Sequence, residues 1–318
     1  MTVRVTAVSR SCGLLLGYAL DQLVGDPRRG HPVAGFGRLA AALERRTHRD
    51  ARAAGVVHTV LLVGATVGLG LAADRATRAH PVTHTAVTAA ATWAVLGGRS
   101  LRREAAAVGD LLDAHDLPGA RRRITHLVGR DPDRLDAAGI ARACVESVAE
   151  NTSDAVVAPL VWGAVAGVPG LLGYRAVNTL DAMIGHRSAR YERFGWAAAR
   201  LDDLANLVPA RLAAGLAAAT APVVGGSPRA AVQVARRDAH KHPSPNAGPV
   251  EAAFAGALGR SLGGVNVYDG AVEDRGTLGD GPAPEPADIR RAVRLSAAVG
   301  GAAAGVAGVA AALVAARR

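Results

Sequence analysis

A row of acids between residues 146 and 154 is the first candidate for chemistry in this sequence. Glu146, Glu150 and Asp154 are spaced four residues apart, and residues at this spacing share one face of a helix. Carboxylates aligned in this way repel one another unless a cation lies between them. Mg²⁺ held by carboxylates and substrate phosphates would supply that cation. We therefore predict that the three acids bind Mg²⁺, with a solvated helix end as the alternative.

A second cluster combines one arginine, one asparagine and three acids between residues 175 and 203. Arg175, Asn178 and Asp181 are spaced three apart, so a helix would place them on one face. Asp202 and Asp203 stand at the start of an apolar run, where an acid is costly unless it has a function or is stabilised by the dipole at a helix N-terminus. We predict a catalytic role for Asp181, and we predict that the other four residues bind substrate and its phosphates.

The third cluster is the loop sequence RDAHKHPSPNAG, residues 237–248. It contains the one lysine among 37 basic residues, which indicates a position where a compact ammonium is needed and a planar guanidinium would not serve. Hydrogen-bond donors on a proline-stiffened loop before a helix N-terminus suit an anion, although the Walker A pattern is absent. We predict that His240, Lys241 and His242 are catalytic and that Arg237 and Asn246 bind phosphate. A solvated basic loop without a ligand is the alternative, and metal binding by the two histidines lacks a third ligand at a suitable spacing.

Long apolar runs must hold these clusters in place. Of 318 residues, 50% are hydrophobic, 20% are charged and only 3% are aromatic, and the mean hydropathy is +0.18. Small apolar residues suit the close packing of helices in a membrane. Five runs approach the roughly 20 residues that cross a hydrocarbon core of about 30 Å: Gly55–Ala73, Pro81–Gly98, Ala155–Tyr174, Leu204–Gly226 and Leu295–Ala315.

These runs predict an all-α fold, a polytopic membrane helical bundle with amphipathic cytoplasmic helices and loops. A soluble, alanine-rich helix is the alternative for the last run. The third run is interrupted by Gly167, Pro169 and Gly170, so we expect it to be re-entrant or only partly inserted. Whether the segment 175–203 faces the inside or the outside is left open by this pattern.

Arginine-rich segments separate the apolar runs and set the expected topology. Residues 26–54, 99–154 and 227–294 carry most of the arginines, and the positive-inside rule places all three in the cytoplasm. We predict a single membrane-embedded domain over residues 1–318. The net charge is +10, but no basic, aromatic-rich recognition motif is present, so we expect a lipid bilayer and no nucleic acid as partner. The two cysteines form no disulfide framework.

Four stretches resemble the adenosylcobinamide-phosphate synthases of cobalamin biosynthesis. They are DQLVGDPRRGHPVAGFGRL (21–39), ESVAENTSDAVVAPL (146–160), YRAVNTLDAMIGHRSARYERFGWAAARLDDLANLVPARL (174–212) and RDAHKHPSPNAGPVEAAFAGALGRSLGG (237–264). The resemblance covers nearly the whole chain and is weakest after Gly264. The first motif departs slightly at Arg28-Arg29-Gly30, where the loop length varies.

The resemblance implies a multi-pass protein of the cell membrane and a carbon–nitrogen ligase. Its expected reaction joins a propionate carboxyl of adenosylcobyric acid to (R)-1-amino-2-propanol or its O-phosphate, with ATP, to give adenosylcobinamide or its phosphate. Other enzymes of the same pathway are candidate partners. Neither the phosphorylation state of the amine nor the oligomeric state follows from the sequence.

The three clusters fit such a reaction. A carboxylate must be activated before an amine can attack it, most simply as an acyl phosphate, and this requires charge neutralisation, a metal and a dry pocket. The acid row would hold Mg²⁺, while Lys241, Arg237 and Arg175 would face phosphates and His240 or His242 would take the proton of the amine. A transporter or binding protein for corrinoids is the alternative, because polar residues and a broken helix within a membrane also fit that class.

Overall fold

The computed structural model describes residues 2–27, 30–129, 131–186, 188–268 and 271–316. Over these residues the chain packs as two compact units, each assembled from segments that are distant in sequence. The first unit contains residues 1–97, 158–206 and 303–318, and the second contains residues 98–157 and 207–302. The second polar cluster therefore belongs to the first unit, whereas the acid row and the basic loop belong to the second.

The first unit is built entirely from helices in the residues described. They are α1 (Thr2–Val24), α2 (Pro32–Thr47), α3 (Arg52–Thr77), α4 (Pro81–Val95), α8 (Ala158–Ala166), α9 (Val168–Leu180), the π-turn η3 (Asp181–Gly185), and parts of α10 (Trp196–Thr220) and α13 (Pro286–Ala316). Proline occupies the first helical position of α2 and α4, where its missing N–H costs nothing. His31 caps α2, since its Nδ1 accepts the N–H of Val33 at 3.1 Å.

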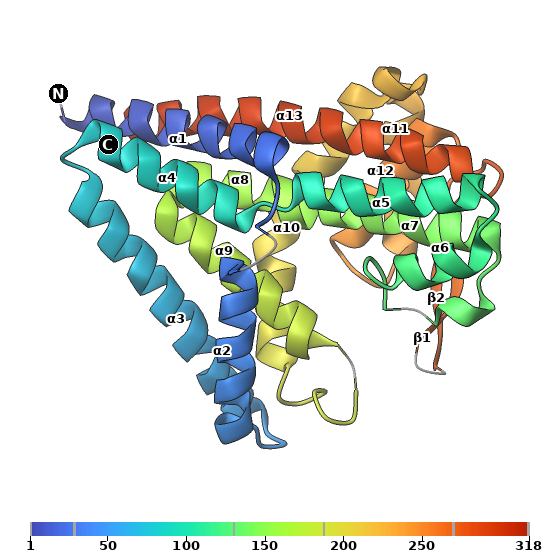
Figure 1. Ribbon diagram of the computed structural model, residues 1–318, viewed down its shortest axis with the longest axis horizontal. Coiled ribbons are helices and arrows are strands. Elements are labelled where there is room, and N and C mark those ends of the chain that lie inside the picture. The colour runs from blue at the N-terminus through green and yellow to red at the C-terminus, as the bar shows by residue number, and fades with distance from the viewer. Residues whose placement is uncertain (1, 28–29, 130, 187, 269–270, 317–318) are drawn as a thin grey trace. The chain divides into compact units, whose positions relative to one another are not determined.

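Glycine permits the closest helix contacts in this unit. Gly13 and Gly17 of α1 lie against Thr88 and Thr92 of α4, where an added Cβ would clash with the threonine side chains. The two helices therefore run side by side (Figure 1). This close approach is the small-residue packing that the composition predicts for membrane helices.

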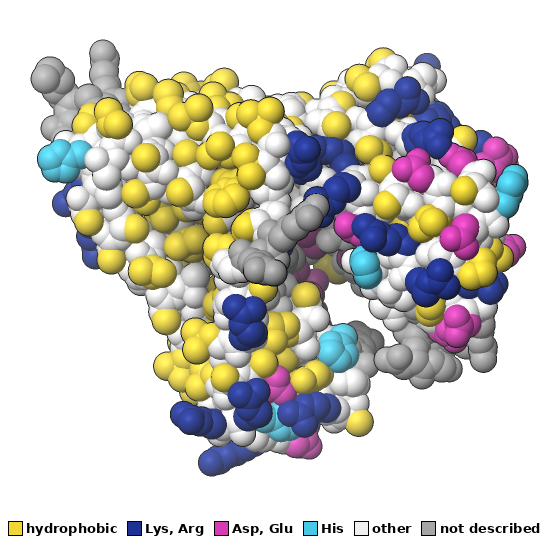
Figure 2. Space-filling model, in the orientation of Figure 1, with side chains coloured by type: hydrophobic (Ala, Val, Ile, Leu, Met, Phe, Trp, Pro, Cys, Tyr) yellow, Lys and Arg dark blue, Asp and Glu magenta, His cyan; other side chains and the backbone are white. Residues whose placement is uncertain are grey.

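Three helices among the described residues are long and apolar enough to cross a membrane: Arg52–Thr77, Trp196–Val224 and Pro286–Val314, with mean hydropathies of 2.0, 1.5 and 2.0. They correspond to three of the five predicted runs, Gly55–Ala73, Leu204–Gly226 and Leu295–Ala315. Exposed apolar side chains follow α1 and α3, including Leu16, Leu20, Val60 and Leu69, and Figure 2 shows this apolar face. The prediction of an all-α membrane protein is therefore confirmed.

The other two predicted runs do not form helices of that length. α4 has 15 residues, and at 1.5 Å per residue it would cover only about 22 Å. The run Ala155–Tyr174 is divided at Gly167, whose φ of +69° ends α8 and begins α9. The break therefore lies where glycine and proline interrupt the apolar pattern.

The second unit combines helices with one β-hairpin. Its helices are α5 (Gly98–Asp113), α6 (Leu117–Ile124), η1 (Pro132–Arg134), α7 (Ala137–Thr152), the π-turn η2 (Ser153–Val157), η4 (Ala221–Val224), α11 (Pro228–Asp238), η5 (Ala239–Lys241) and α12 (Ala247–Leu258), together with the remaining parts of α10 and α13. Strands β1 (Leu262–Tyr268) and β2 (Ala271–Leu278) pair antiparallel, with Leu262 opposite Leu278. Both leucines are fully buried, so the hairpin is anchored to the unit through its open end. Among the described residues, this hairpin is a departure from helix that the sequence analysis did not predict.

Candidate functional site

A chain of buried polar groups connects α9 with α10 in the first unit. The Tyr174 hydroxyl donates to Asn206 Oδ1 at 2.8 Å, and Asn206 Nδ2 donates to Asp202 Oδ2 at 2.9 Å. The second carboxylate oxygen of Asp202 accepts from Asn178 Nδ2 at 3.5 Å, and Arg175 Nη1 donates to Asn178 Oδ1 at 3.4 Å. Asn206 is 1% exposed and Asp202 is 9% exposed. Polar groups buried in helices of a membrane protein mark a functional site unless they serve packing alone.

This chain brings together three of the residues that the sequence nominates, Arg175, Asn178 and Asp202. The periodicity of α9 explains the first two, because residues three apart share a face. Asp203, the neighbouring acid, is instead 3.3 Å from Arg200 on the more exposed side of α10. The partners Tyr174 and Asn206 have no assigned role in the sequence analysis. The spacing of four between Asp202 and Asn206 on one helix was the signal that could have revealed them.

Asp181 lies at the start of the π-turn that ends α9. Gly185 packs directly over its carboxylate, and any side chain at position 185 would collide with Asp181 Oδ1. A side chain at position 185 would therefore displace the Asp181 carboxylate from this place. Asp181 and Asp202 stand at the two ends of the segment 181–202, so the placement of that segment determines the placement of both acids.

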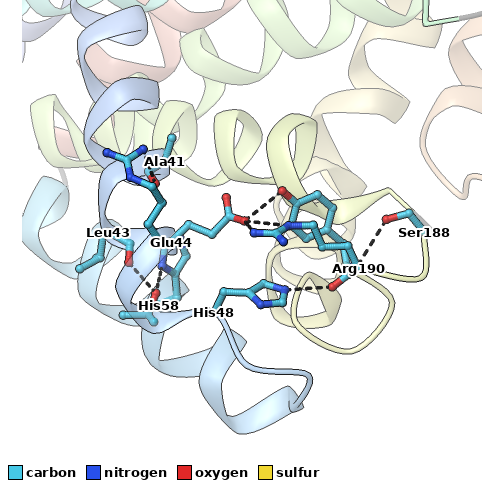
Figure 3. Close-up of polar contacts among 10 residues, drawn as sticks. Ala41, Leu43, Glu44, His48, His58, Ser188 and Arg190 are labelled. Carbon is cyan, nitrogen blue, oxygen red and sulfur yellow. Dashed lines mark hydrogen bonds and ion pairs between the residues drawn. The ribbon is translucent and has the colours of Figure 1, made fainter.

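A cluster of polar contacts around Glu44 connects this segment with the end of α2 (Figure 3). The Glu44 carboxylate accepts hydrogen bonds from Arg190 Nη2 at 2.8 Å and from the Tyr191 hydroxyl at 3.0 Å. The imidazole of His48 contacts the carbonyl oxygen of Arg190 at 3.1 Å. Burial opposes ionisation of Glu44, but the hydrogen bonds from Arg190 and Tyr191 outweigh it and lower the pKa of the carboxyl group. The sequence analysis missed Glu44 because its partners are 146 and 147 residues away.

Phe194, in the same segment, anchors it in the core of the unit. Its side chain is fully buried, and its ring centre lies 4.9 Å from that of His48 and 5.1 Å from that of His58. Gly195 follows, and a side chain there would collide with the backbone of Ile184. Packing and polar contacts together hold the connection between Asp181 and Asp202 in one place.

Glu146 of the second unit is buried and contacts the backbone of the β-hairpin. Glu146 is 2% exposed, its Oε1 accepts the N–H of Gly263 at 2.7 Å, and Arg142 Nε is 4.0 Å away. Asp154 falls inside the π-turn η2, where a spacing of four residues no longer repeats one helical face. Among the described residues, no three His, Cys, Asp or Glu side chains are grouped to hold a metal ion. The Mg²⁺ site of the acid row, with substrate phosphates as further ligands, therefore stays a prediction, and the printed contact of Glu146 connects α7 with the hairpin.

The basic loop is organised around an acid, Asp238. This fully buried carboxylate accepts hydrogen bonds from Arg237 Nη2 at 2.7 Å and from the N–H of Gly279 at 2.9 Å, and Lys241 Nζ lies 2.6 Å away. The hydrogen bonds from Arg237, followed by those from Lys241 and Gly279, hold the pKa of Asp238 well below its ordinary range. Arg237 also pairs with Asp280 at 2.7 Å. The two cations are thus balanced by two acids, a pairing that the sequence analysis did not anticipate.

The three remaining residues of this loop differ in accessibility. His242 is buried, its Nδ1 accepts the N–H of Ser244 at 3.0 Å, and its Nε2 lies 3.7 Å from Glu251 Oε1. Asn246 is also buried and its Oδ1 accepts from Arg211 Nη1 at 3.0 Å. Both ring nitrogens of His242 therefore face groups of the protein. Of the two histidines, the exposed His240 is better placed to exchange a proton with a substrate.

Comparison with known proteins identifies the family. The described helices define an all-α membrane protein that buries a polar chain between two of its helices. A family model described as CobD/Cbib protein matches residues 14–296. The chain is 59% identical over 292 residues to the cobalamin biosynthesis protein CobD of Mycobacterium tuberculosis, which covers 92% of each chain. The chain belongs to the CobD/CbiB family, which confirms the resemblance carried by the four motifs.

More distant relatives give the same result. The CobD proteins of Geobacter metallireducens and Rhodobacter capsulatus are 47% and 44% identical to this chain. The matches cover 84% and 89% of this chain and 86% and 91% of the relatives. No solved structure matches the chain significantly.

Proposed function

We propose that this protein acts in cobalamin biosynthesis as an adenosylcobinamide-phosphate synthase of the cell membrane. It would join the propionate carboxyl of adenosylcobyric acid to 1-amino-2-propanol or its O-phosphate. Membership of the CobD/CbiB family supports the pathway, since the relatives are named cobalamin biosynthesis proteins. The main structural support for the site is the chain of buried hydrogen bonds from Arg175 to Tyr174. This chain presents a cation and a fixed carboxylate inside a membrane protein.

The reaction consumes ATP, which would activate the carboxylate so that an amine can displace phosphate and form the amide. Arg175 would bind and orient the substrate carboxylate, with Asn178 holding the guanidinium in place. Asp202, which accepts a hydrogen bond from Asn206, would place a negative charge near the Arg175 guanidinium. The exposed His240 would accept the proton that the amine loses when the C–N bond forms. Lys241, 41% exposed in its side chain, would present its ammonium to an anionic group as a point charge.

A direct assay tests this proposal. Purified protein in lipid nanodiscs is incubated with adenosylcobyric acid, aminopropanol phosphate and Mg-ATP, and the corrinoids are analysed by mass. The proposal requires a product heavier than the acid by the amine minus one water, formed only when ATP is present. Recovery of the acid unchanged, with ATP and amine in excess, would refute it.

One observation favours a second candidate, a corrinoid transporter. The chain breaks at Gly167 between α8 and α9, and broken helices occur at the substrate sites of transporters. Proteoliposomes distinguish the two functions. A transporter would move labelled corrinoid into vesicles without changing its mass, whereas a synthase would change its mass without a need for a second compartment.

A further inference from the structure

A cavity of about 360 Å³ in the first unit lies beside the buried polar chain. It is lined by α2, α3, α4 and α9 and is open on one side, and its walls are almost wholly apolar, with side chains such as Phe36, Leu62, Val95 and Leu172. The wall from α2 begins at Pro32 and Val33, within the first of the four sequence motifs, to which no site residue has yet been assigned. The first motif therefore lies next to the third, residues 174–212, which contributes Arg175, Ala176 and Thr179 to the lining.

Arg175 is the only charged side chain among the described residues that line the cavity. The two hydroxyl groups of the lining are committed to their own helices, because Thr66 donates to the carbonyl of Leu62 and Thr179 to that of Arg175, both at 2.7 Å. Arg175 is thus the one cationic hydrogen-bond donor among the described residues of the lining. Asn178 accepts one of its donors at 3.4 Å and so restricts the orientation of the guanidinium.

The charge of this lining selects the class of occupant. A polyphosphate carries several negative charges, and burying them against apolar walls with a single cation would leave most of them uncompensated, at high cost. A single carboxylate on an apolar body needs one cation only, and a guanidinium matches its two oxygens. Ligand pockets for drug-sized molecules occupy about 300–1,000 Å³, so a cavity of this volume would admit one arm and the adjoining edge of a macrocycle, and not a whole corrinoid.

We infer that this cavity binds the carboxylate-bearing edge of the corrinoid substrate, with the carboxylate on Arg175, and that the nucleotide phosphates bind elsewhere. The inference rests on the proposed function and makes it more specific. It places that carboxylate and the adjoining edge of the ring in this cavity, and it gives the first motif a role as the apolar wall against which the edge of the ring packs.

Two glycines make the test selective. Gly35 lines the cavity, and a Cβ added there would meet only Arg38 Nη2, at 3.9 Å, so Gly35→Leu is the variant chosen to fill the cavity. Gly68 on α3 is outside the lining and has nothing within 4 Å of an added Cβ, so Gly68→Leu is the matched control. Leucine is a better helix former than glycine by about 0.5–1 kcal/mol, and both variants are expected to fold.

The measurement is equilibrium dialysis of purified protein against adenosylcobyric acid and against the same corrinoid with its carboxylate converted to a primary amide. The wild type and Gly68→Leu should prefer the acid by about tenfold to a hundredfold, the range for a hydrogen bond to a charged group. Arg175→Gln should lose this preference while still binding the amide. Gly35→Leu should bind both compounds about tenfold more weakly or worse. Lipids that copurify with each variant are identified by mass in the same samples.

Three results would overturn the inference. They are a preference for the acid that survives in Arg175→Gln, corrinoid binding that is unchanged in Gly35→Leu, and a Gly35→Leu variant that loses a copurified anionic lipid but keeps its corrinoid affinity. The last result would make the cavity a lipid site. If wild-type protein makes the amide while these variants keep the wild-type KM for the corrinoid, the inference fails and the proposed function stands. If the wild type neither binds nor converts the acid, the proposed function fails and the inference fails with it.

Discussion

Replacement of Asn206 by leucine removes the central link of the buried polar chain. Asn206 donates to Asp202 at 2.9 Å and accepts from the Tyr174 hydroxyl at 2.8 Å, and its side chain is 1% exposed. Leucine has the same branching at Cγ, with two methyl groups in place of Oδ1 and Nδ2, but makes neither hydrogen bond. Asp202 would then lose one donor to its carboxylate, and the Tyr174 hydroxyl would lose its acceptor.

The expected cost follows from the two bonds that are lost. A hydrogen bond to a charged group contributes about 1.5–3 kcal/mol, whereas hydrogen bonds between membrane helices average about 0.6 kcal/mol. We therefore expect Asn206→Leu to lower the free energy of unfolding by roughly 2–4 kcal/mol. Tyr174→Phe breaks only the weaker bond and should cost about 0.6–1 kcal/mol.

The assay is denaturant unfolding in detergent micelles of the wild type, the two single variants and the double variant. Because both substitutions break the same Tyr174–Asn206 bond, the double variant should be less destabilised than the sum of the single variants. Strict additivity, or an Asn206→Leu protein as stable as the wild type, would refute the reasoning that these residues form one coupled chain.

Four further predictions concern the loop, the hairpin, the Glu44 cluster and the topology. Lys241→Arg and Lys241→Ala should both lose most activity at saturating substrates while the protein still folds, because a planar guanidinium does not reproduce a compact ammonium; a near wild-type kcat for the arginine variant would contradict this. Glu146→Gln should lower the free energy of unfolding by about 1–3 kcal/mol, since its carboxylate binds the Gly263 N–H, and should leave the Mg²⁺ dependence of activity unaltered. The pKa of Glu44 is lowered in the folded state, so its contribution to stability is fully present above its ordinary pKa of about 4.3 and is lost as the pH falls through the lowered value. The difference in stability between the wild type and Glu44→Ala should therefore shrink on acidification. A constant difference between pH 7 and pH 3 would argue against this role of Glu44. In a background without the exposed Cys12, single cysteines should resist labelling from outside intact cells at positions Arg45, Arg122 and Arg236, whereas labelling at any two of them would reverse the topology.

The membrane helices and the helix-based part of the site were predictable because their signals are local. A run of about 20 apolar residues reveals α3 without knowledge of its neighbours, and the glycine–proline pattern marks the break at Gly167. The spacing of Arg175 and Asn178 likewise follows from the period of a single helix. These properties depend only on residues within a few turns of each other.

The parts that were missed depend on contacts between distant residues or on the balance of charges. Glu44 belongs to the site only because α2 packs beside a segment that follows it by 146 residues. The row of acids had the right spacing, but α7 directs Glu146 to the backbone of the hairpin, and no local pattern indicates that hairpin. In the basic loop the prediction rested on Arg237 and Lys241 and left out Asp238, the acid that pairs with both of them. A sequence reading that paired each cation with the nearest acid would have found this last feature.

The central claim is that the protein activates a substrate carboxylate and joins it to an amine. The most direct measurement follows the carboxylate oxygens. Adenosylcobyric acid labelled with ¹⁸O in its propionate carboxylate is incubated with the protein, aminopropanol phosphate and Mg-ATP, and the inorganic phosphate and the corrinoid product are analysed by mass. Activation as an acyl phosphate predicts that one ¹⁸O atom passes to phosphate for each amide formed, and that the other remains in the amide carbonyl. Unlabelled phosphate, or full recovery of the doubly labelled acid, would contradict the account.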